Sequence, residues 1–131
     1  MWVSHLEENG FKVKTTDVPD INRVKQVAGV PRQAGSCHTA IVDGYVIEGH
    51  VPAEDVKRLL ADRPAVRGIA VPGMPIGSPG MEIPGREPEP FDVLAFDENG
   101  QLTHFASHYF RRATDCWVDT AEFALFLFCV G

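Results

Sequence analysis

The sequence predicts a single α/β domain in which helices pack against a mixed β-sheet. The chain has 131 residues, enough for one domain. Its hydrophobic fraction of 44% allows a real core and excludes wholesale disorder. Helical and strand patterns follow each other in the order helix, strand, helix, hairpin, helix, an order typical of a sheet covered by helices.

The first three elements follow from periodicity and stop signals. Trp2, Val3 and Leu6 have helical spacing, and Asn9-Gly10 ends this short helix. Residues 11–16 alternate apolar and polar side chains, which predicts a strand with one buried face. A second helix begins after this strand, near Pro19, and ends at Gly29.

A hairpin and a third helix complete the first half. Thr39–Val42 is an apolar strand, and Asp43-Gly44 predicts a type I′ turn, in which both central residues need positive φ. Tyr45–Ile47 returns as the partner strand. Pro52 opens a helix with acidic residues in its first turn, and Pro64 stops it.

The second half predicts a long loop and another hairpin. Residues 71–90 hold six of the ten prolines and four glycines, so no regular element is expected there. A loop of this length is usually functional or mobile. Phe91–Phe96 then predicts a strand, Asn99-Gly100 a turn, and Leu102–Tyr109 the returning strand.

The end of the chain has a different character. Residues 111–120 are polar and compatible with a helix, and residues 121–130 are almost wholly apolar. We therefore divide the chain into a domain over residues 1–110 and a divergent tail over residues 111–131, which we expect to be helical.

Composition excludes several classes of function. Twelve basic and eighteen acidic side chains give a net charge of −6, which argues against a nucleic-acid surface because such a surface needs clustered Lys and Arg. No apolar stretch approaches the roughly 20 residues that cross a bilayer. The first ten residues hold no apolar run, so this chain shows no secretory signal and is expected in the cytoplasm as written.

Motifs for catalysis and cofactor binding are absent from the sequence. It has no Gly-rich phosphate loop, no Gly-x-Ser-x-Gly and no His-Glu-x-x-His. The three cysteines are Cys37, Cys116 and Cys129, and no two of them form a Cys-x-x-Cys pair or a disulfide framework. We assign no catalytic and no cofactor-binding residues, and we expect a protein that is not an enzyme.

Two histidines and a cysteine are candidates for metal binding. Cys37 and His38 place a thiol beside an imidazole before a predicted strand, and such ligands suit copper or zinc. His50 stands just before the third helix, whose dipole favours the neutral, metal-binding imidazole. The alternatives are a buried Cys beside a surface His, because neighbours on a strand point to opposite faces, and a His50 that serves only the turn.

Sulfur recurs in the long loop. Met74 and Met81 lie seven residues apart where proline and glycine exclude a helix. Thioethers are soft ligands that choose Cu(I), although methionines also fill gaps in a core. His104 and His108 have spacing that suits a metal on a helix, but on a strand they stand about 13 Å apart, too far for one ion.

Several stretches together resemble a known family, the CopG-type bacterial metal-binding proteins associated with copper resistance. The matching stretches include Trp2–Leu6, Ser36–Thr39, Asp43–Pro52, Ala70–Pro75 and Gly77–Glu82, and the similarity runs from Trp2 to about Phe105. The resemblance implies a thioredoxin-like fold, thiol ligation of Cu(I), other copper-handling proteins as partners, and a periplasmic setting for full-length members.

The same resemblance shows a departure. Family members carry a Cys-x-Cys-Cys cluster after a first sheet strand, just before the tryptophan that matches Trp2, and both features are missing here. We expect the missing strand to leave an open sheet edge. The family's remaining cysteine corresponds to Cys37 and its Met-bearing loop to Met74 and Met81. A gene start placed too far downstream is the simplest explanation.

The resulting interpretation is Cu(I) sequestration or handling, with Cys37 as the thiolate ligand. Met74 and Met81 are candidate thioether ligands, and His38 and His50 are candidate supporting ligands. Two alternatives stay open. The first is a thiol-disulfide or electron-transfer protein, which needs two neighbouring cysteines. The second is a fragment without an activity of its own.

Overall fold

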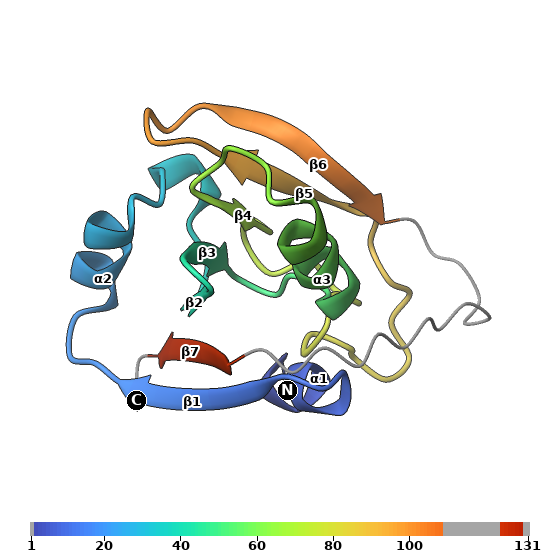
Figure 1. The fold of residues 1–131 in the computed structure, drawn as a ribbon. Helices are drawn as coiled ribbons and strands as arrows, with labels where there is room; N and C mark the ends of the chain where they lie inside the picture. The colour runs from blue at the N-terminus through green and yellow to red at the C-terminus, as the bar shows by residue number, and fades with distance from the viewer. Residues whose placement is uncertain (1, 109–123, 130–131) are drawn as a thin grey trace.

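The computed structural model describes residues 2–108 and 124–129, and these form a mixed sheet with helices on both faces (Figure 1). Seven strands are present in this part of the chain, in the sheet order β1-β7-β2-β3-β4-β5-β6. The strands are β1 (Lys12–Asp17), β2 (Thr39–Val42), β3 (Tyr45–Glu48), β4 (Gly68–Ala70), β5 (Phe91–Phe96), β6 (Leu102–His108) and β7 (Ala124–Cys129).

The helices divide the core between the two faces of the sheet. Helices α1 (Trp2–Glu8) and α3 (Ala53–Asp62) share one cluster, in which Trp2 and Leu6 are buried with Leu59. Helix α2 (Ile21–Ala28) belongs to a smaller cluster on the other face, where Ala28 is buried with Val46 and Phe96. None of the helices among the described residues is long and apolar enough to cross a membrane.

Local chemistry accounts for the predicted boundaries. The Asp20 side chain caps α2 by accepting from the Asn22 N–H, and Gly29 ends the helix in the left-handed region at φ 81°. At the β2–β3 turn, Asp43 and Gly44 have φ values of 48° and 85°, as a type I′ turn requires. The predicted α/β class with a mixed sheet is therefore confirmed, and the thioredoxin-like assignment stays a prediction.

Strand β4 was missing from the prediction because it is only three residues long, too short for a periodic pattern. Its first residue, Gly68, pairs with Val46 in β3. A Cβ at Gly68 would lie 2.0 Å from the Val46 carbonyl oxygen, so glycine is required by the close approach of the two backbones.

The expectation of a helical tail is wrong for its apolar part. Residues 124–129 form β7, which pairs in parallel with β1 and antiparallel with β2. A short continuous apolar run is compatible with a helix or with a central strand, and periodicity alone cannot separate the two. Strand β7 thus lies between β1 and β2, while residues 109–123 lie outside the described part of the chain.

One edge of the sheet gathers the segments that carry the predicted ligands. Strands β1, β7, β3 and β4 run in one direction and end there, and the antiparallel β2 begins there. Cys37 and His38 immediately precede β2, and His50 follows β3 by two residues. The loop that contains Met74 and Met81 follows β4. We call this the ligand edge.

Candidate metal centre

The structure brings Cys37, His38 and His50 together at the ligand edge. Their candidate ligand atoms all lie within 4.8 Å of one another. The Cys37 Sγ and the His50 Nε2 are 3.1 Å apart. Cys37 and His38 come before the first residue of β2, so the opposite-face constraint of a regular strand does not separate them.

His50 is held with one nitrogen turned toward the thiol. Its Nδ1 lies 2.6 Å from the Pro79 carbonyl oxygen, which can only accept, so Nδ1 carries the proton and donates it. Nε2 therefore presents its lone pair to Cys37. Burial lowers the pKa of His50, and the ring is neutral at neutral pH. An N–H to carbonyl bond that orients the opposite nitrogen is the usual arrangement of a metal-binding histidine.

His38 is half-buried, and its two ring nitrogens lie on the buried side without a polar partner among the described residues. In the described part of the chain, neither of its ring nitrogens makes a hydrogen bond, although both are inaccessible to solvent. The ring stacks on Trp2 with centroids 4.6 Å apart and meets His50 edge-on at 4.7 Å. Burial, with a smaller contribution from His50, lowers the pKa of His38 to about 3. Buried polar atoms without partners are rare in native proteins and call for an explanation such as an unfilled ligand site.

Cys37 is the solvent-facing member of the three. Its side chain reaches the surface, and partial burial of the thiol raises its pKa. The metal-free thiol is therefore protonated at neutral pH. Because the thiolate is the form that binds metals, binding at Cys37 would release a proton.

A buried ion pair supports the segment that carries Cys37. The Glu48 carboxylate is fully buried and pairs with Lys25 of α2. It also accepts a 2.7 Å bond from the Thr39 hydroxyl and a 3.0 Å bond from the Ser36 backbone N–H. Burial raises the pKa of Glu48, and Lys25 offsets part of that shift. The carboxylate thus anchors the backbone on both sides of Cys37 and His38.

Helix α1 closes the opposite side of the site. The Trp2 indole N–H donates to the Val51 carbonyl oxygen at 2.7 Å. The His5 Nε2 accepts from the Ala53 N–H at 3.0 Å, so His5 satisfies one of the free N–H groups at the start of α3. Burial lowers the pKa of His5, consistent with a neutral acceptor. These contacts hold the Trp2 ring over His38.

The methionine loop is tied to the site at two points. The Ser36 hydroxyl donates to the Gly73 carbonyl oxygen at 2.5 Å, and the Pro79 carbonyl accepts from His50 as described above. Met74 follows Gly73 and is 55% exposed, which excludes the gap-filling alternative for this residue. Met81 is half-buried. Both methionines therefore stand within two residues of a bond to the Cys37 and His50 segments.

The two histidines of β6 behave as the strand spacing predicts and share no site. His104 bonds to the Ser107 hydroxyl at 2.7 Å, and it is exposed. His108 lies 2.5 Å from the buried Asp55 carboxylate and 3.5 Å from Glu54, and it stacks on Phe91. This second cluster had no signal in the sequence. Because both ring nitrogens of His108 already face carboxylates, it is an ion pair that joins β6 to α3.

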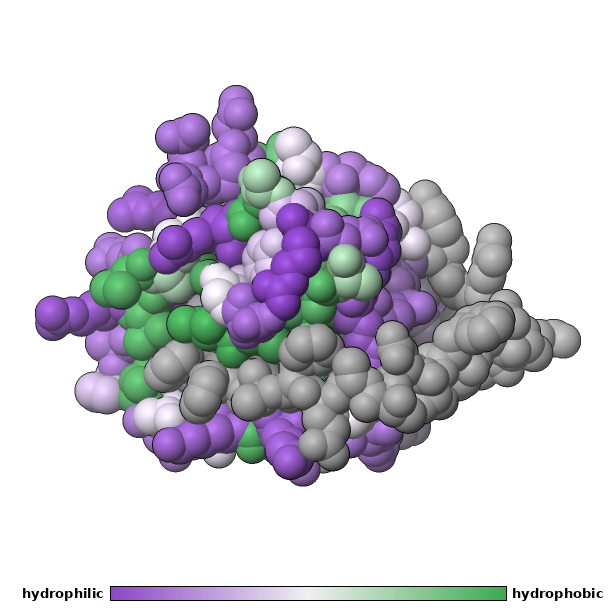
Figure 2. All heavy atoms as spheres, viewed as in Figure 1, coloured by the Kyte–Doolittle hydropathy of each residue, from purple (hydrophilic) through white to green (hydrophobic). Residues whose placement is uncertain are grey.

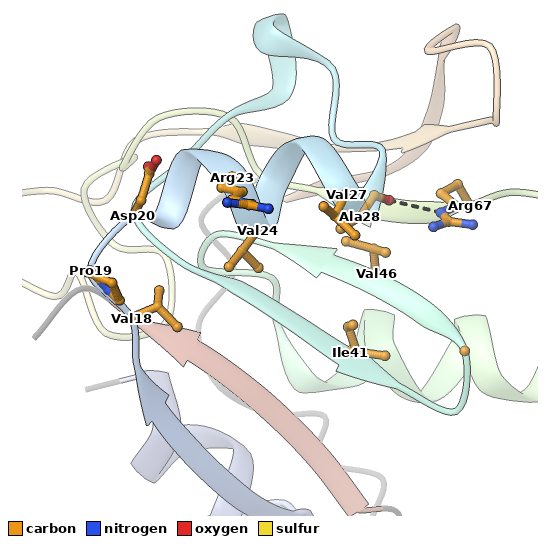
Figure 3. A pocket seen from close by; sticks show the side chains of 11 residues that line it. Val18, Pro19, Asp20, Arg23, Val24, Val27, Ala28, Ile41, Val46 and Arg67 are labelled. Atoms are coloured by element: carbon orange, nitrogen blue, oxygen red, sulfur yellow. Dashed lines mark hydrogen bonds between the residues drawn. The ribbon is translucent and has the colours of Figure 1, made fainter.

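A separate hollow of about 640 Å³ lies between α2 and the β2–β3 hairpin (Figure 3). Figure 2 shows apolar side chains gathered on the side of the molecule where α2 lies beside the sheet. The Arg67 Nε donates to the Ala28 carbonyl oxygen at one end of the hollow. None of its lining residues is a cysteine, histidine or methionine, so it offers no soft ligand; they are Val18, Pro19, Asp20, Arg23, Val24, Val27, Ala28, Ile41, Gly44, Val46 and Arg67.

The sequence and the structure thus agree on Cys37, His38 and His50 as neighbours. Sequence reasoning missed the supporting roles of Trp2, His5 and Glu48, which depend on contacts across the sheet that no local spacing reveals. Of the two other cysteines, Cys116 lies outside the described residues and Cys129 ends β7.

Comparison with known proteins gives a consistent picture. A family model described as "Protein of unknown function, DUF411" matches residues 34–81. Two solved structures named "Copper resistance protein copG", Form 2 and Form 1, are similar to the chain at 45% and 46% identity, with TM-scores of 0.77 and 0.76. Each match covers 82% of this chain, and 86% and 84% of the respective structure. No curated protein matches the chain.

Proposed function

Since this chain belongs to the family of the copper resistance protein CopG, we propose that it acts in copper resistance by binding Cu(I) at Cys37, His38 and His50. The observation that carries the proposal is the convergence of one thiol and two neutral imidazoles within 4.8 Å. One of the imidazoles, that of His38, has no partner for either nitrogen in the part of the chain that the structure describes. Thiolate and imidazole are ligands of copper and zinc, and the names of the related structures favour copper.

The spacing of the three side chains fits a small ion. With bonds of about 2.3 Å to sulfur and about 2.0 Å to nitrogen, a trigonal ion needs its sulfur and nitrogen ligands about 3.7 Å apart and its two nitrogen ligands about 3.5 Å apart. The Cys37 Sγ and the His50 Nε2 are slightly closer than this, at 3.1 Å. All three ligand atoms lie within 4.8 Å of one another, so the required separations fall within the range that the site shows.

The neighbouring methionines extend the proposal. Met74 and Met81 are candidate thioether ligands, because their loop is bonded to both halves of the site. Thioethers are weaker ligands than thiolates, so they would support Cu(I) binding and not carry it. We expect the Met74→Leu and Met81→Leu variants to lose less affinity than a variant at Cys37.

Cu(I) titration of the reduced protein under anaerobic conditions, with bicinchoninate as competitor, tests the proposal. We expect wild type to bind Cu(I) and Cys37→Ser to lose roughly 100-fold or more in affinity. His104→Gln is the matched control, because it removes an exposed imidazole outside the site. Equal stoichiometry and affinity for wild type and Cys37→Ser would remove Cys37 from the site and end the proposal.

Two further measurements address the alternative functions. Reduction of insulin disulfides by the reduced protein would favour thiol-disulfide chemistry, and we expect none above the Cys37→Ser background. A cooperative melt that shifts upward with Cu(I) would argue against an inert fragment. Ligand at 100 times its Kd stabilises the native state by about 2.7 kcal/mol, a shift that calorimetry resolves easily.

A further inference from the structure

The hollow between α2 and the β2–β3 hairpin is not used by the proposed function. Helix α2 places Ile21, Val24 and Ala28 at helical spacing, yet only Ala28 is buried. Val27 is 76% exposed, more than any other large hydrophobic residue that the structure describes. The apolar side of α2 is therefore only partly covered by the sheet, and the hollow of about 640 Å³ occupies the remaining space.

Apolar side chains from three segments form the walls of this hollow. Val24 and Val27 come from α2, Ile41 and Val46 from the hairpin, and Val18 from the segment after β1. Figure 3 shows Val24 pointing from the helix toward the sheet and Ile41 pointing from β2 toward the helix. Small-molecule sites are mostly apolar and have volumes of roughly 300–1,000 Å³. The hollow thus has the size and the lining of a site for an apolar ligand.

The hollow is elongated along α2. Val18 follows β1, which ends at the ligand edge, whereas Arg67 precedes β4, which begins at the opposite edge of the sheet. Both residues line the hollow, so it extends from one edge to the other. The eight residues of α2 give the helix a length of about 12 Å. This shape suits an unbranched chain better than a compact ring.

Two arginines favour negative charge in the ligand. Arg23 and Arg67 line the hollow, and neither has a carboxylate partner among the described residues, although the net charge of the chain is −6. The Arg67 Nε donates to the Ala28 carbonyl oxygen at 2.9 Å, which fixes this guanidinium at one end. Asp20 lies at the other end and already accepts from the Asn22 N–H (Figure 3). A guanidinium binds a carboxylate through two parallel hydrogen bonds.

We propose that this hollow binds an unbranched apolar carboxylate of the medium-chain fatty-acid type. Its carboxylate would pair with Arg67, and its alkyl chain would lie between Val24 and Ile41. Burial of the chain supplies the affinity, and the guanidinium sets the orientation. The hollow shares no lining residue with Cys37, His38 and His50, so this inference does not rest on the proposed function.

Isothermal titration calorimetry with octanoate tests the proposal. We expect saturable binding of one octanoate per chain, about tenfold tighter than the binding of 1-octanol or of octyltrimethylammonium, because only the carboxylate pairs with the arginines. Equal affinity for the three amphiphiles would show that charge plays no part, and it would overturn the proposal. The absence of octanoate binding would overturn it as well.

Variants test the location of the site. Arg67→Gln should weaken octanoate binding about tenfold and leave 1-octanol binding unchanged. Arg86→Gln is the matched control, because Arg86 is exposed and lies outside the hollow. Val27→Glu should also weaken octanoate binding, and circular dichroism with a thermal melt checks that this exposed position tolerates the change. Octanoate affinity that is unchanged in both Arg67→Gln and Val27→Glu would refute the assignment.

Other occupants of the hollow predict different results. If a second copy of the chain covers it, sedimentation equilibrium will show a wild-type dimer and a Val27→Glu monomer. If a lipid surface covers it, wild type will sediment with phosphatidylglycerol vesicles and Val27→Glu will not. Either result without octanoate binding would overturn the proposal. Cys37→Ser should bind octanoate as wild type does, so the failure of one proposal is distinguishable from the failure of the other.

Discussion

Replacing His38 by phenylalanine is expected to stabilise the metal-free protein and to weaken Cu(I) binding. The ring stacks on Trp2, yet its two nitrogens are buried with no hydrogen-bond partner among the described residues. Phenylalanine keeps a ring in the stack and removes both polar atoms. The variant thus separates the effect of His38 on the stability of the metal-free protein from its effect on the affinity for Cu(I).

The expected gain follows from the cost of unpaired polar groups. A buried donor or acceptor without a partner costs about 1–3 kcal/mol, and a neutral imidazole has one of each. Phenylalanine is larger than histidine, and overpacking takes back about 1–3 kcal/mol. At the midpoints of these ranges, the two unpaired groups cost about 4 kcal/mol and overpacking takes back about 2 kcal/mol, so we expect a net stabilisation of about 2 kcal/mol. For a chain of this size, each kcal/mol raises the melting temperature by roughly 3–5 °C.

Urea unfolding and calorimetry of the metal-free protein measure the gain, and bicinchoninate competition measures the loss of Cu(I) affinity, which we expect to reach about tenfold. His104→Phe is the matched control, because the same substitution at an exposed position should change stability by less than about 0.5 kcal/mol. His38→Leu repeats the test with a smaller side chain.

A single pattern of results refutes this reasoning. If both His38→Phe and His38→Leu destabilise the metal-free protein and leave Cu(I) affinity unchanged, then His38 is a satisfied core residue. An ordered water that bonds to its ring would produce that pattern. His38 would then contribute to packing and would not be a metal ligand.

Three further predictions concern the scaffold of the site. Glu48→Gln should lower the free energy of unfolding in urea by about 3–5 kcal/mol, because it leaves the Lys25 ammonium without its buried carboxylate. The double variant Glu48→Leu with Lys25→Met should lose much less stability, and equal losses for the two proteins would contradict the ion-pair argument. His108→Asn should destabilise the protein by about 1.5–3 kcal/mol near pH 5.5 and by little near pH 9. The bond to Asp55 raises the pKa of His108, so the stability that this bond contributes is full below pH 6.5 and is lost as the pH rises through the raised pKa. A loss of stability that does not depend on pH would exclude this linkage. Gly49→Ala should lower the free energy of unfolding by more than about 1 kcal/mol, because φ is +78° and the added methyl group would lie 2.6 Å from a backbone carbonyl oxygen. Gly44→Asn, at a position with open space, should lower it by less. The reverse order of the two losses would be inconsistent with the backbone geometry.

Much of the fold could be predicted from local patterns. Gly29 is recognisable as a helix end because the left-handed conformation restricts residue choice, whereas the start of α2 was expected near Pro19 and lies at Ile21, with Asp20 as its cap. Asp43-Gly44 specifies its turn for the same reason. Strands β4 and β7 could not be predicted in this way. Three residues are too few for a period, and an uninterrupted apolar run fits both a helix and a central strand until its neighbours are known.

The site divides along similar lines. Cys37, His38 and His50 could be identified by residue type, and the family resemblance strengthened the choice. What could not be predicted is how they are held. Glu48 looks like an ordinary strand residue in the sequence, and its partners Lys25 and Ser36 come from other segments. Hydrogen bonds between distant segments produce no periodic pattern in the sequence from which they could be predicted.

The topology of the sheet explains why one edge can serve as a metal site. Parallel strands β1, β7, β3 and β4 end together, so the segments that follow β1, β3 and β4 leave the sheet at the same place. Side chains from separate parts of the sequence then meet on a rigid base, which fixes their positions more precisely than a mobile loop could. The ring nitrogens of His38, which have no hydrogen-bond partner among the described residues, are the cost of that preorganisation: the fold holds the ring between Trp2 and His50, and an ion that binds there would recover the energy that the metal-free protein forgoes.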